Sequence, residues 1–451
     1  MTYLEAVELI RQIEDKYDVM SVKYKGISVW PHLRLYLLDR VSGQTEIKGT
    51  GTIIKVVFRS LFAYNPFRFF KHYTIWLFTG CERRKRIDGK MIHRISGGFS
   101  ASNSDYLMIE KPNVTIGHYK REEIEEKNII SEAWLLVLFH LIQVITRPFN
   151  QTIENEGILK TILNDYKLRF DYGHYVRSLN AKRLSLLYLI KLTKRPKLAV
   201  IECPYNSMGY VWAFHQKGVK VLEMQHGVVS RSHNAYNAKA YEPMLNPDEI
   251  CVFGSAEYRY FTEEEPQYTP KIYMTGLYML EKSDEFFKQD VFSEYRKKYN
   301  KVVVCSGQNG CEDKLSLFVN EIAVEHSDLI FVYIPRSSNA DLTFTEENVV
   351  LAREINIYQY LKWADIHITI SSTTCLEAQY FGTPTIFYDF NSMASTYYGD
   401  LLKEENGAFY ISTQKDFSSA LLSLKQNRFN YLEVFAHQHI DKINYVLKQS
   451  M

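Results

Sequence analysis

A histidine stands directly after an apolar, strand-like stretch of this chain. Residues 219–224 read VKVLEM and run into Gln225 and His226. A neutral imidazole with a pKa near its ordinary ~6.5 can take a proton from an alcohol at physiological pH. Most loop histidines are structural, so a catalytic role for His226 depends on whether its loop faces a cleft. Arg231 and His233 follow closely, and each could bind an anionic group or lie on the loop surface.

Four consecutive hydroxyl residues precede a helical pattern near the end of the chain: Ser371, Ser372, Thr373 and Thr374. Hydroxyls and free backbone N–H groups at a helix N-terminus suit a phosphate. The alternative is an ordinary capping box, with Thr374 as the N-cap and Glu377 closing it. One cap needs only one hydroxyl, so the run of four favours phosphate binding. Glu377 is then available for the hydroxyls of a ribose.

Two more strand-like stretches end in polar loops. KVVVCS leads into Gly307, Gln308 and Asn309, where glycine could let backbone N–H groups approach a diphosphate. DLIFVYIP leads into Arg336, a cation on the same predicted sheet edge. The loops match neither a GxGxxG fingerprint nor a P-loop. Because the carboxyl ends of parallel strands meet at one edge, we expect these loops to lie beside the hydroxyl run.

The elements that must position these loops form an alternating series. From residue 197 onward, apolar strand-like stretches alternate with helical patterns, which predicts parallel sheets covered by helices on both faces. The series breaks between residues 276 and 301. We therefore predict an α/β protein with two Rossmann-like, doubly wound domains that face a central cleft.

The predicted first domain covers 1–276 and the second covers 300–430. Residues 431–451 form a terminal helical segment that could pack back on the first domain. The strand exits after residues 225, 254, 306, 335 and 370 should line the cleft. Residues 81–120 give no readable pattern.

The composition limits the class of partner and the compartment. Lys and Arg number 54 against 52 Asp and Glu, so nothing resembles a basic nucleic-acid-binding domain. The six cysteines show no disulfide framework or zinc pattern, which favours a reducing cytoplasm. Asp-x-Asp, the metal-binding carboxylate pair of one class of nucleotide-sugar enzymes, is absent, so we expect no metal.

The charge is unevenly distributed along the first part of the chain. Residues 55–94 contain ten Lys or Arg and two acids, and aromatic and basic residues alternate from Lys55 to Tyr73. This pattern indicates either peripheral attachment to an anionic membrane surface or an amphipathic helix with a solvated basic face. The apolar run at 134–146 is shorter than the ~20 residues of a membrane span and predicts a buried helix.

Three motifs resemble those of bacterial GT-B glycosyltransferases that make surface polysaccharides. They are MQHG at 224–227, KIYMTG at 271–276 and SSTTCLEAQYFGTPTIFY at 371–388; VWPHLRLYLLDR at 29–40 also looks like the opening of such proteins. The most similar group is the capsule and lipopolysaccharide group with Kdo transferases, sialyltransferases and CDP-glycerol glycerophosphotransferases. The resemblance covers residues 197–390.

The resemblance implies transfer of a sugar from a nucleotide-activated donor to a carbohydrate or lipid-linked acceptor, with no cofactor. It implies that Ser371, Ser372 and Thr373 hold the donor phosphate, Glu377 the ribose, and that His226 is a base on the acceptor side. Gln225, Arg231 and His233 then belong to that side. Related cytidine-nucleotide enzymes often carry His-Pro at the strand exit where this chain has Ile334-Pro335-Arg336. Either Arg336 replaces that contact or the donor differs, so the nucleotide stays open.

Three other functions stay open at this point. One is a polyol-phosphate transferase that uses CDP-glycerol or a relative. Another is a nucleotide-sugar 2-epimerase, which shares the two-domain architecture but needs no separate acceptor. The third is a non-catalytic GT-B scaffold in a polysaccharide assembly complex, against which the intact QHG and SSTT motifs argue. The expected location is the cytoplasm, with peripheral attachment to the inner face of the membrane.

Overall fold

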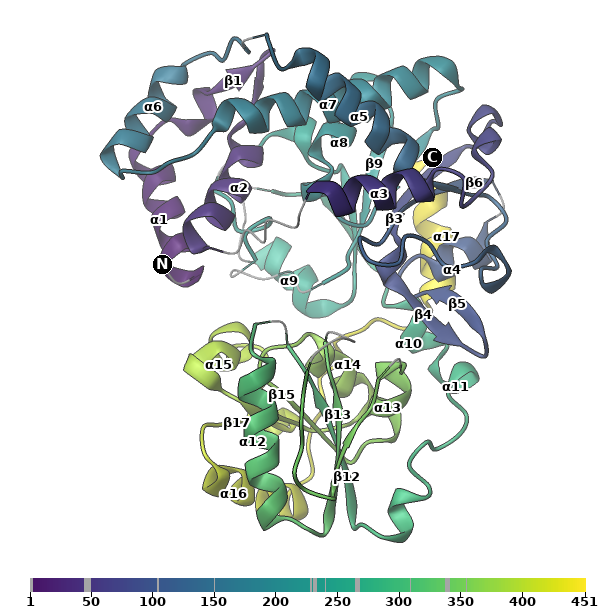
Figure 1. Ribbon diagram of the computed structural model, residues 1–451, viewed down its shortest axis with the longest axis vertical. Helices are drawn as coiled ribbons and strands as arrows, with labels where there is room; N and C mark the ends of the chain where they lie inside the picture. The colour runs from purple at the N-terminus through teal and green to yellow at the C-terminus, as the bar shows by residue number, and fades with distance from the viewer. Residues whose placement is uncertain are drawn as a thin grey trace.

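The computed structural model describes residues 3–43, 50–103, 105–149, 151–227, 229, 233–239, 241–263, 268–308, 310–336, 341–353 and 355–451. Two α/β domains lie one above the other in Figure 1, and each is built on a parallel sheet. Two predicted site residues, Arg231 and Asn309, lie outside the described residues.

The N-terminal domain contains a seven-stranded sheet in the order β11-β10-β9-β8-β3-β6-β7, with every neighbouring pair parallel. Its strands are β3 (Ile75–Gly80), β6 (Tyr106–Lys111), β7 (Ile129–Ser131), β8 (Leu198–Ile201), β9 (Lys220–Met224), β10 (Glu249–Val252) and β11 (Lys271–Met274). Strands β3, β8 and β10 are buried along their whole length, which explains their continuous apolar sequences.

Helices cover this sheet, and two small antiparallel pairs lie outside it. The helices are α1 (Tyr3–Lys16), α2 (Trp30–Ser42), α3 (Thr50–Ser60), α4 (Gly97–Ser102), α5 (Ala133–Thr146), α6 (Glu156–Asp165), α7 (Tyr172–Leu192), α8 (Met208–Gln216) and α9 (Ser255–Glu263). The pairs are β1 (Lys23–Tyr24) with β2 (Ile27–Ser28), and β4 (Arg84–Ile87) with β5 (Lys90–His93).

The C-terminal domain contains a six-stranded parallel sheet in the order β14-β13-β12-β15-β16-β17. Its strands are β12 (Lys301–Ser306), β13 (Leu329–Ile334), β14 (Val349–Leu351), β15 (Ile366–Thr369), β16 (Thr385–Tyr388) and β17 (Ala408–Ile411). Its helices are α12 (Glu312–Glu325), α13 (Ile357–Trp363), α14 (Thr374–Phe381), α15 (Met393–Tyr398) and α16 (Gln414–Gln426). The short helices α10 (Tyr278–Glu281) and α11 (Ser283–Phe286) precede this domain.

Each sheet begins in its middle and is extended first to one side and then to the other. The C-terminal order corresponds to 3-2-1-4-5-6, with the reversal between β12 and β15, and the N-terminal sheet reverses between β3 and β8. This is the doubly wound Rossmann pattern. Two such domains that meet at their carboxyl edges form a GT-B-like architecture, which confirms the predicted fold class.

The chain returns to the N-terminal domain at its end. Helix α17 (His439–Ser450), yellow in Figure 1, packs on α4, and His439 Nδ1 lies 2.8 Å from the carbonyl oxygen of Thr275. The segment before it covers the exit of β10, because a Cβ on Gly254 would lie 2.2 Å from the carbonyl oxygen of Val434. The exit after residue 254 is therefore closed by the chain itself and does not line a cleft.

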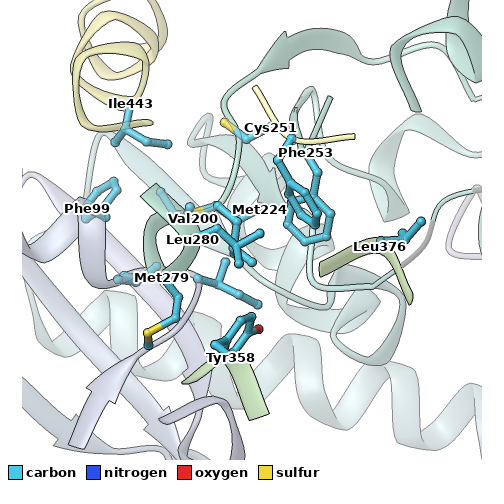
Figure 2. Packing of buried hydrophobic residues seen from close by; sticks show 14 of the residues in the cluster. Phe99, Val200, Met224, Cys251, Phe253, Met279, Leu280, Tyr358, Leu376 and Ile443 are labelled. Carbon is cyan, nitrogen blue, oxygen red and sulfur yellow. The ribbon is translucent and has the colours of Figure 1, made fainter. Parts of the chain in front are cut away.

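One hydrophobic cluster joins the two domains. Figure 2 shows Tyr358 and Leu376 of the C-terminal domain in the same cluster as Phe253 and Leu280. The cluster also contains Val434 of the returning segment. Because buried apolar contacts cross the junction, the two sheets are held together by packing as well as by polar contacts.

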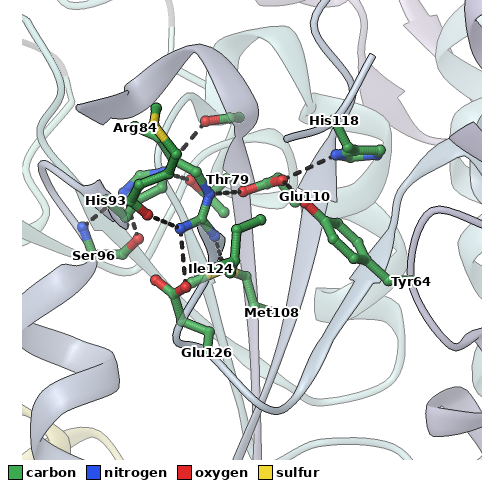
Figure 3. Close-up of polar contacts among 12 residues, drawn as sticks. Tyr64, Thr79, Arg84, His93, Ser96, Met108, Glu110, His118, Ile124 and Glu126 are labelled. Atoms are coloured by element: carbon green, nitrogen blue, oxygen red, sulfur yellow. Dashed lines mark hydrogen bonds and ion pairs between the residues drawn. The ribbon is translucent and has the colours of Figure 1, made fainter. Parts of the chain in front are cut away.

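A buried arginine anchors the β4–β5 hairpin to the N-terminal sheet (Figure 3). Arg84 Nε donates to Glu110 Oε2 at 2.5 Å, and its Nη1 donates to Glu126 Oε2 at 2.9 Å and to the Met91 carbonyl at 2.8 Å. Although burial alone would raise it, the pKa of Glu110 falls to about 2 because of Arg84 and His118. The hairpin therefore carries its own ion-pair anchor, which alternation of apolar residues could not reveal.

We predict that Arg84→Met lowers the free energy of unfolding by about 3–5 kcal/mol, because it leaves the Glu110 carboxylate buried without its cation. Arg86→Met is the matched control on the same hairpin. The Arg86 side chain is 54% exposed, and its contact with Glu123 contributes under ~1 kcal/mol. Denaturant unfolding of both variants measures the difference, and equal losses would contradict the anchoring role.

Candidate active site between the two sheets

The candidate site lies where the reversal points of the two sheets meet. In the N-terminal sheet, β3 and β8 end close to Arg83 and Glu202. In the C-terminal sheet, β12 ends at Ser306 and β15 ends two residues before Ser371. Open α/β sheets bind ligands outside the carboxyl ends of the strands at such points.

Arg94 connects the two domains at this place. It directly follows β5, and its Nη2 donates to the backbone carbonyl of His226 at 3.2 Å. Its Nη1 lies 3.9 Å from Glu377 Oε1, and its guanidinium carbon lies 6.0 Å from the centre of the Tyr358 ring. One side chain therefore joins the exit of β9 to the first turns of α14.

Four cations from the two domains converge around this contact: Arg83, Lys85, Arg94 and Arg336. Burial, together with the charges of Arg94 and Arg336, lowers the pKa of Lys85 to about 8. Although Arg336 is exposed as a residue, partial desolvation and the charges of Arg94 and Arg83 lower its pKa as well. Because the cations repel one another, the junction favours an anionic ligand.

The hydroxyl run begins α14 on the same junction. The helix starts at Thr374 with Thr373 as its N-cap. The N–H groups of Ser372 and Thr373 donate to no atom of the described residues, whereas the Thr374 hydroxyl lies 2.9 Å from Ser306 Oγ. Two backbone donors and the Ser372 and Thr373 hydroxyls thus lie at the helix start, where an anion is favoured.

Glu377 does not close a capping box. Its Oε1 lies 3.4 Å from the Tyr358 hydroxyl, and its carboxylate faces Arg94. Burial raises the pKa of Glu377, although Arg94 opposes the shift. The capping-box alternative is wrong, because the helix begins one residue earlier than it requires and the Glu377 side chain faces the other domain.

Gly307 makes room for a carboxylate. A Cβ at this position would lie 1.9 Å from Glu312 Oε1, which accepts the Arg336 N–H at 2.6 Å. The Gly307 N–H donates to the Ile334 carbonyl at 2.8 Å. The Gly307 N–H is therefore already bonded, and the approach of other backbone N–H groups of this loop to a diphosphate stays a prediction. Gln308 follows at the same strand end, with its Oε1 buried.

His226 stands at the end of β9, and its Nε2 lies 2.9 Å from the hydroxyl of Tyr205. Burial and the nearby charge of Arg83 hold the pKa of His226 well below its ordinary value. The structure does not support the expected pKa near 6.5, because the imidazole is buried and lies near Arg83 and Arg94. His226 is therefore neutral at pH 7, which is the form that can accept a proton.

The other two acceptor-side residues support this loop. Gln225 accepts the Phe253 N–H at 2.6 Å and donates to Glu257 Oε1 at 2.9 Å. The His233 ring lies 5.5 Å from the ring of Tyr205, and burial lowers the pKa of His233 to about 4. Gln225 therefore positions the strand exit, and His233 packs behind the tyrosine that contacts the catalytic candidate.

Glu202 is a site residue that the sequence interpretation missed. It directly follows β8, where Thr79 Oγ1 donates to its Oε2 at 2.8 Å. Burial raises the pKa of Glu202 to about 7, so its carboxyl can both give and take a proton at neutral pH. The sequence could have indicated Glu202, because it directly follows the apolar stretch KLAVI, and His226 was selected for its position after a similar stretch.

Buried polar atoms without a partner concentrate at this junction. Of the fifteen buried side-chain atoms without a hydrogen bond among the described residues, six belong to site residues: Arg94 Nε, Glu202 Oε1, His226 Nδ1, Gln308 Oε1, Glu312 Oε2 and Glu377 Oε2. Of these, Glu202 Oε1 still lies 3.4 Å from His93 Nδ1. Buried polar groups in proteins are nearly always hydrogen-bonded. Their concentration at two facing strand edges supports a binding site for a polar ligand.

One side-chain cluster in the described part of the chain has the spacing of a metal site. It consists of Cys81, Glu110 and His118. The Glu110 carboxylate already binds Arg84 and the Tyr64 hydroxyl. Because a guanidinium stands beside this carboxylate, a second cation would be repelled, and we assign the cluster to the hairpin anchor.

We predict that Ser372→Asp weakens nucleotide binding at least about tenfold, because it places a carboxylate where the phosphate would lie. The fold should survive, since a carboxylate is favourable at a helix start. Ser419→Asp is the control, as Ser419 is an exposed residue of α16 on the far side of the same domain. Calorimetric titration with UMP, GDP, CMP and CDP measures both; unchanged affinity in folded Ser372→Asp would refute the phosphate site.

Comparisons with known proteins give similarity of structure only. No model of a known protein family matches the chain, and no curated protein matches its sequence. UDP-GlcNAc 2-epimerase from Methanocaldococcus jannaschii is 10% identical over 83% of this chain and 99% of its own, with a TM-score of 0.49. S. aureus MnaA in a structure with UDP is 12% identical over 82% and 91%, with a TM-score of 0.46. The spinosyn rhamnosyltransferase SpnG is 11% identical over 83% and 95%, with a TM-score of 0.42. At these values the similarity assigns neither a substrate nor a reaction.

Proposed function

We propose that this chain is an enzyme that binds a nucleotide-linked sugar between its two domains. The observation that carries the proposal is the position of Arg94, which joins the His226 loop to Glu377 within a group of four cations. The group lies at the reversal points of both sheets. In a nucleotide diphosphate linked to a sugar, the negatively charged diphosphate can bind the four cations. The hydroxyl groups of the ribose and the sugar can donate hydrogen bonds to the buried carboxyl groups.

The C-terminal domain holds the nucleotide in this proposal. The diphosphate binds the N–H groups and hydroxyls of Ser372 and Thr373, with Arg336 nearby. Glu377 accepts hydrogen bonds from the ribose hydroxyls through its Oε2, which is buried without a partner. A carboxylate that accepts two hydroxyls is a common arrangement for ribose recognition.

The N-terminal domain then carries out the chemistry on the sugar. Glu202 and His226 follow the neighbouring parallel strands β8 and β9, so two groups able to carry protons lie side by side. Glu202 is 3% exposed. A carboxyl group that is this enclosed suits a reaction that needs only the bound nucleotide sugar, without a separate acceptor molecule. Inversion of a sugar carbon by proton exchange breaks a C–H bond on one face and forms a C–H bond on the other, so it needs both a base and an acid. We therefore place 2-epimerisation of the nucleotide sugar first.

Glycosyl transfer to a lipid-linked acceptor is the second candidate. It is favoured by a group of exposed aromatic side chains on the N-terminal domain, which includes Phe67 and Phe70. In that reaction, Glu202 or His226 takes the proton of the acceptor hydroxyl. Assignment to surface-polysaccharide synthesis stays a prediction from the sequence motifs.

A panel of UDP-, GDP-, CMP- and CDP-linked sugars, followed by NMR, separates these reactions. Epimerisation gives a second nucleotide sugar with no nucleotide released, whereas transfer releases the nucleotide only when an acceptor is added. If no donor binds or reacts, the proposed function is wrong.

Glu202→Gln should lower turnover by roughly 10²–10⁴-fold, the usual contribution of a positioned acid–base group. If the carboxylate is the base, kcat/KM of the wild type rises as the pH rises through about 7, because Glu202 loses its proton there. That rise should be absent in the variant. Glu132→Gln is the control, since burial also raises the pKa of Glu132, but its carboxyl accepts the Tyr210 hydroxyl and none of the four junction cations contributes to its shift. Equal losses in both variants would remove Glu202 from the mechanism.

A further inference from the structure

We propose that one face of the N-terminal domain binds the surface of an anionic phospholipid bilayer. The face, called here the aromatic face, consists of residues 55–74, 133–149 and 184–197. They contain the described part of α3, the 3-10 helix η2 (Pro66–Phe70), helix α5 and the carboxyl end of α7. These helices lie together in the upper domain of Figure 1, where α5 contacts both α3 and α7.

Large apolar side chains are concentrated on this face. Of the eighteen exposed large hydrophobic residues among the described positions, ten belong to it: Phe58, Phe62, Phe67, Phe70, Leu141, Val144, Ile145, Phe149, Tyr188 and Leu192. Phe62 and Phe67 are each 73% exposed, and Leu192 is 71% exposed. Single exposed apolar residues are ordinary, but a contiguous group marks an interaction surface.

The aromatic side chains surround a defined groove. A groove of about 430 Å³ is lined by Phe62, Phe67, Phe70, Trp134, Leu141 and Leu192, among others. Trp134 Nε1 donates to the Leu61 carbonyl at 2.8 Å, and its ring lies edge to face with Phe62 at 5.4 Å. The groove is therefore part of the folded domain.

The charge of this face identifies the occupant. Residues 55–74, 133–149 and 184–197 contain nine Lys or Arg and no Asp or Glu. The whole chain has 54 basic and 52 acidic residues, so the rest of the chain has 45 basic against 52 acidic residues. Aromatic side chains flanked by basic residues without acids are the composition that binds anionic membrane surfaces. A second copy of the chain fits poorly, because it would bring the same positive charges face to face.

The structure places only some of the residues from which membrane attachment was expected on the aromatic face. Helix α5 is buried on one side only, and Leu141, Val144 and Ile145 are exposed on the other, so the expectation of a buried helix is half right. Residues 83–94 lie at the domain junction and are not part of the aromatic face. No helix within the described ranges is long and apolar enough to cross a membrane. The proposed contact is therefore with the bilayer surface, and it does not depend on the proposed reaction.

Sedimentation of the full chain with vesicles tests the proposal. We expect binding to equal parts of phosphatidylcholine and phosphatidylglycerol, and little binding to phosphatidylcholine alone. Binding should fall between ~0.01 M and ~1 M salt, as the screening length shortens from ~30 Å to ~3 Å. No binding at low salt, or binding that ignores both lipid charge and salt, overturns the proposal.

Paired variants separate the apolar and the charged contributions. Phe67→Ser with Phe70→Ser should weaken the vesicle partition at least about tenfold, since it removes exposed apolar area. Lys71→Glu with Lys194→Glu should weaken it at least about 25-fold, because each basic residue near an anionic surface contributes roughly fivefold. The controls carry the same changes on exposed residues of the C-terminal domain: Leu317→Ser with Leu422→Ser, and Lys425→Glu with Arg428→Glu.

Equal losses in the control variants would overturn the proposal, because they would show no role for this face. Analytical ultracentrifugation without vesicles provides the second readout. If the wild type is a dimer and Phe67→Ser with Phe70→Ser makes it a monomer, the face is an interface between copies and the membrane proposal is wrong. Nucleotide affinity should be unchanged in every variant, which keeps a failure here distinct from a failure of the proposed function.

Discussion

The site depends on one buried ion pair in the N-terminal domain. Arg84 binds the carboxylates of Glu110 and Glu126 with no exposure to solvent at the guanidinium. Burying charges in this way is rarely a net gain in stability over apolar packing, so its value lies in fixing position. The pair holds the β4–β5 hairpin on β6, and the residue that follows the hairpin is Arg94. The only side chain that links the His226 loop to Glu377 among the described residues is thus held in place by an ion pair outside the site.

The two sheets explain why the remaining groups converge. In each sheet the chain adds strands to one side of the first strand and then to the other side. The loops after the two strands at this reversal point therefore leave the same edge of the sheet in opposite directions. Residues that directly follow these strands must lie at that edge, whatever their distance in the sequence. Glu202 and Ser371 are 169 positions apart by their numbers. They approach the same junction because both follow a central strand.

This geometry also decides how much could be predicted from the sequence. The strand exits at His226 and Ser371 follow long apolar stretches, and the sequence pattern therefore located both. The hairpin could not be located in the same way. Its strands read RKRI and KMIH, in which Arg84 and His93 are buried together with Ile87 and Met91, so the buried positions do not read as hydrophobic alternation. Gly307 shows a different limit, because a glycine after a strand fits either a ligand or a neighbouring carboxylate. Only the position of Glu312 distinguishes the two.

The basic stretch from Lys55 to Arg94 serves two separate purposes in the fold. Its first part remains on the surface among exposed aromatic residues, and its second part, from Arg83, enters the domain junction. The junction cations raise the electrostatic free energy of this arrangement where Arg83 and Arg94 of one domain face Arg336 of the other, and the contact of Arg94 with Glu377 offsets part of this repulsion. An anionic ligand between them lowers that free energy, and it does so only when both domains contribute their charges. Ligand binding and apposition of the two sheets are therefore thermodynamically linked: whatever anion the site binds also stabilises the arrangement that places Glu202 and His226 beside it.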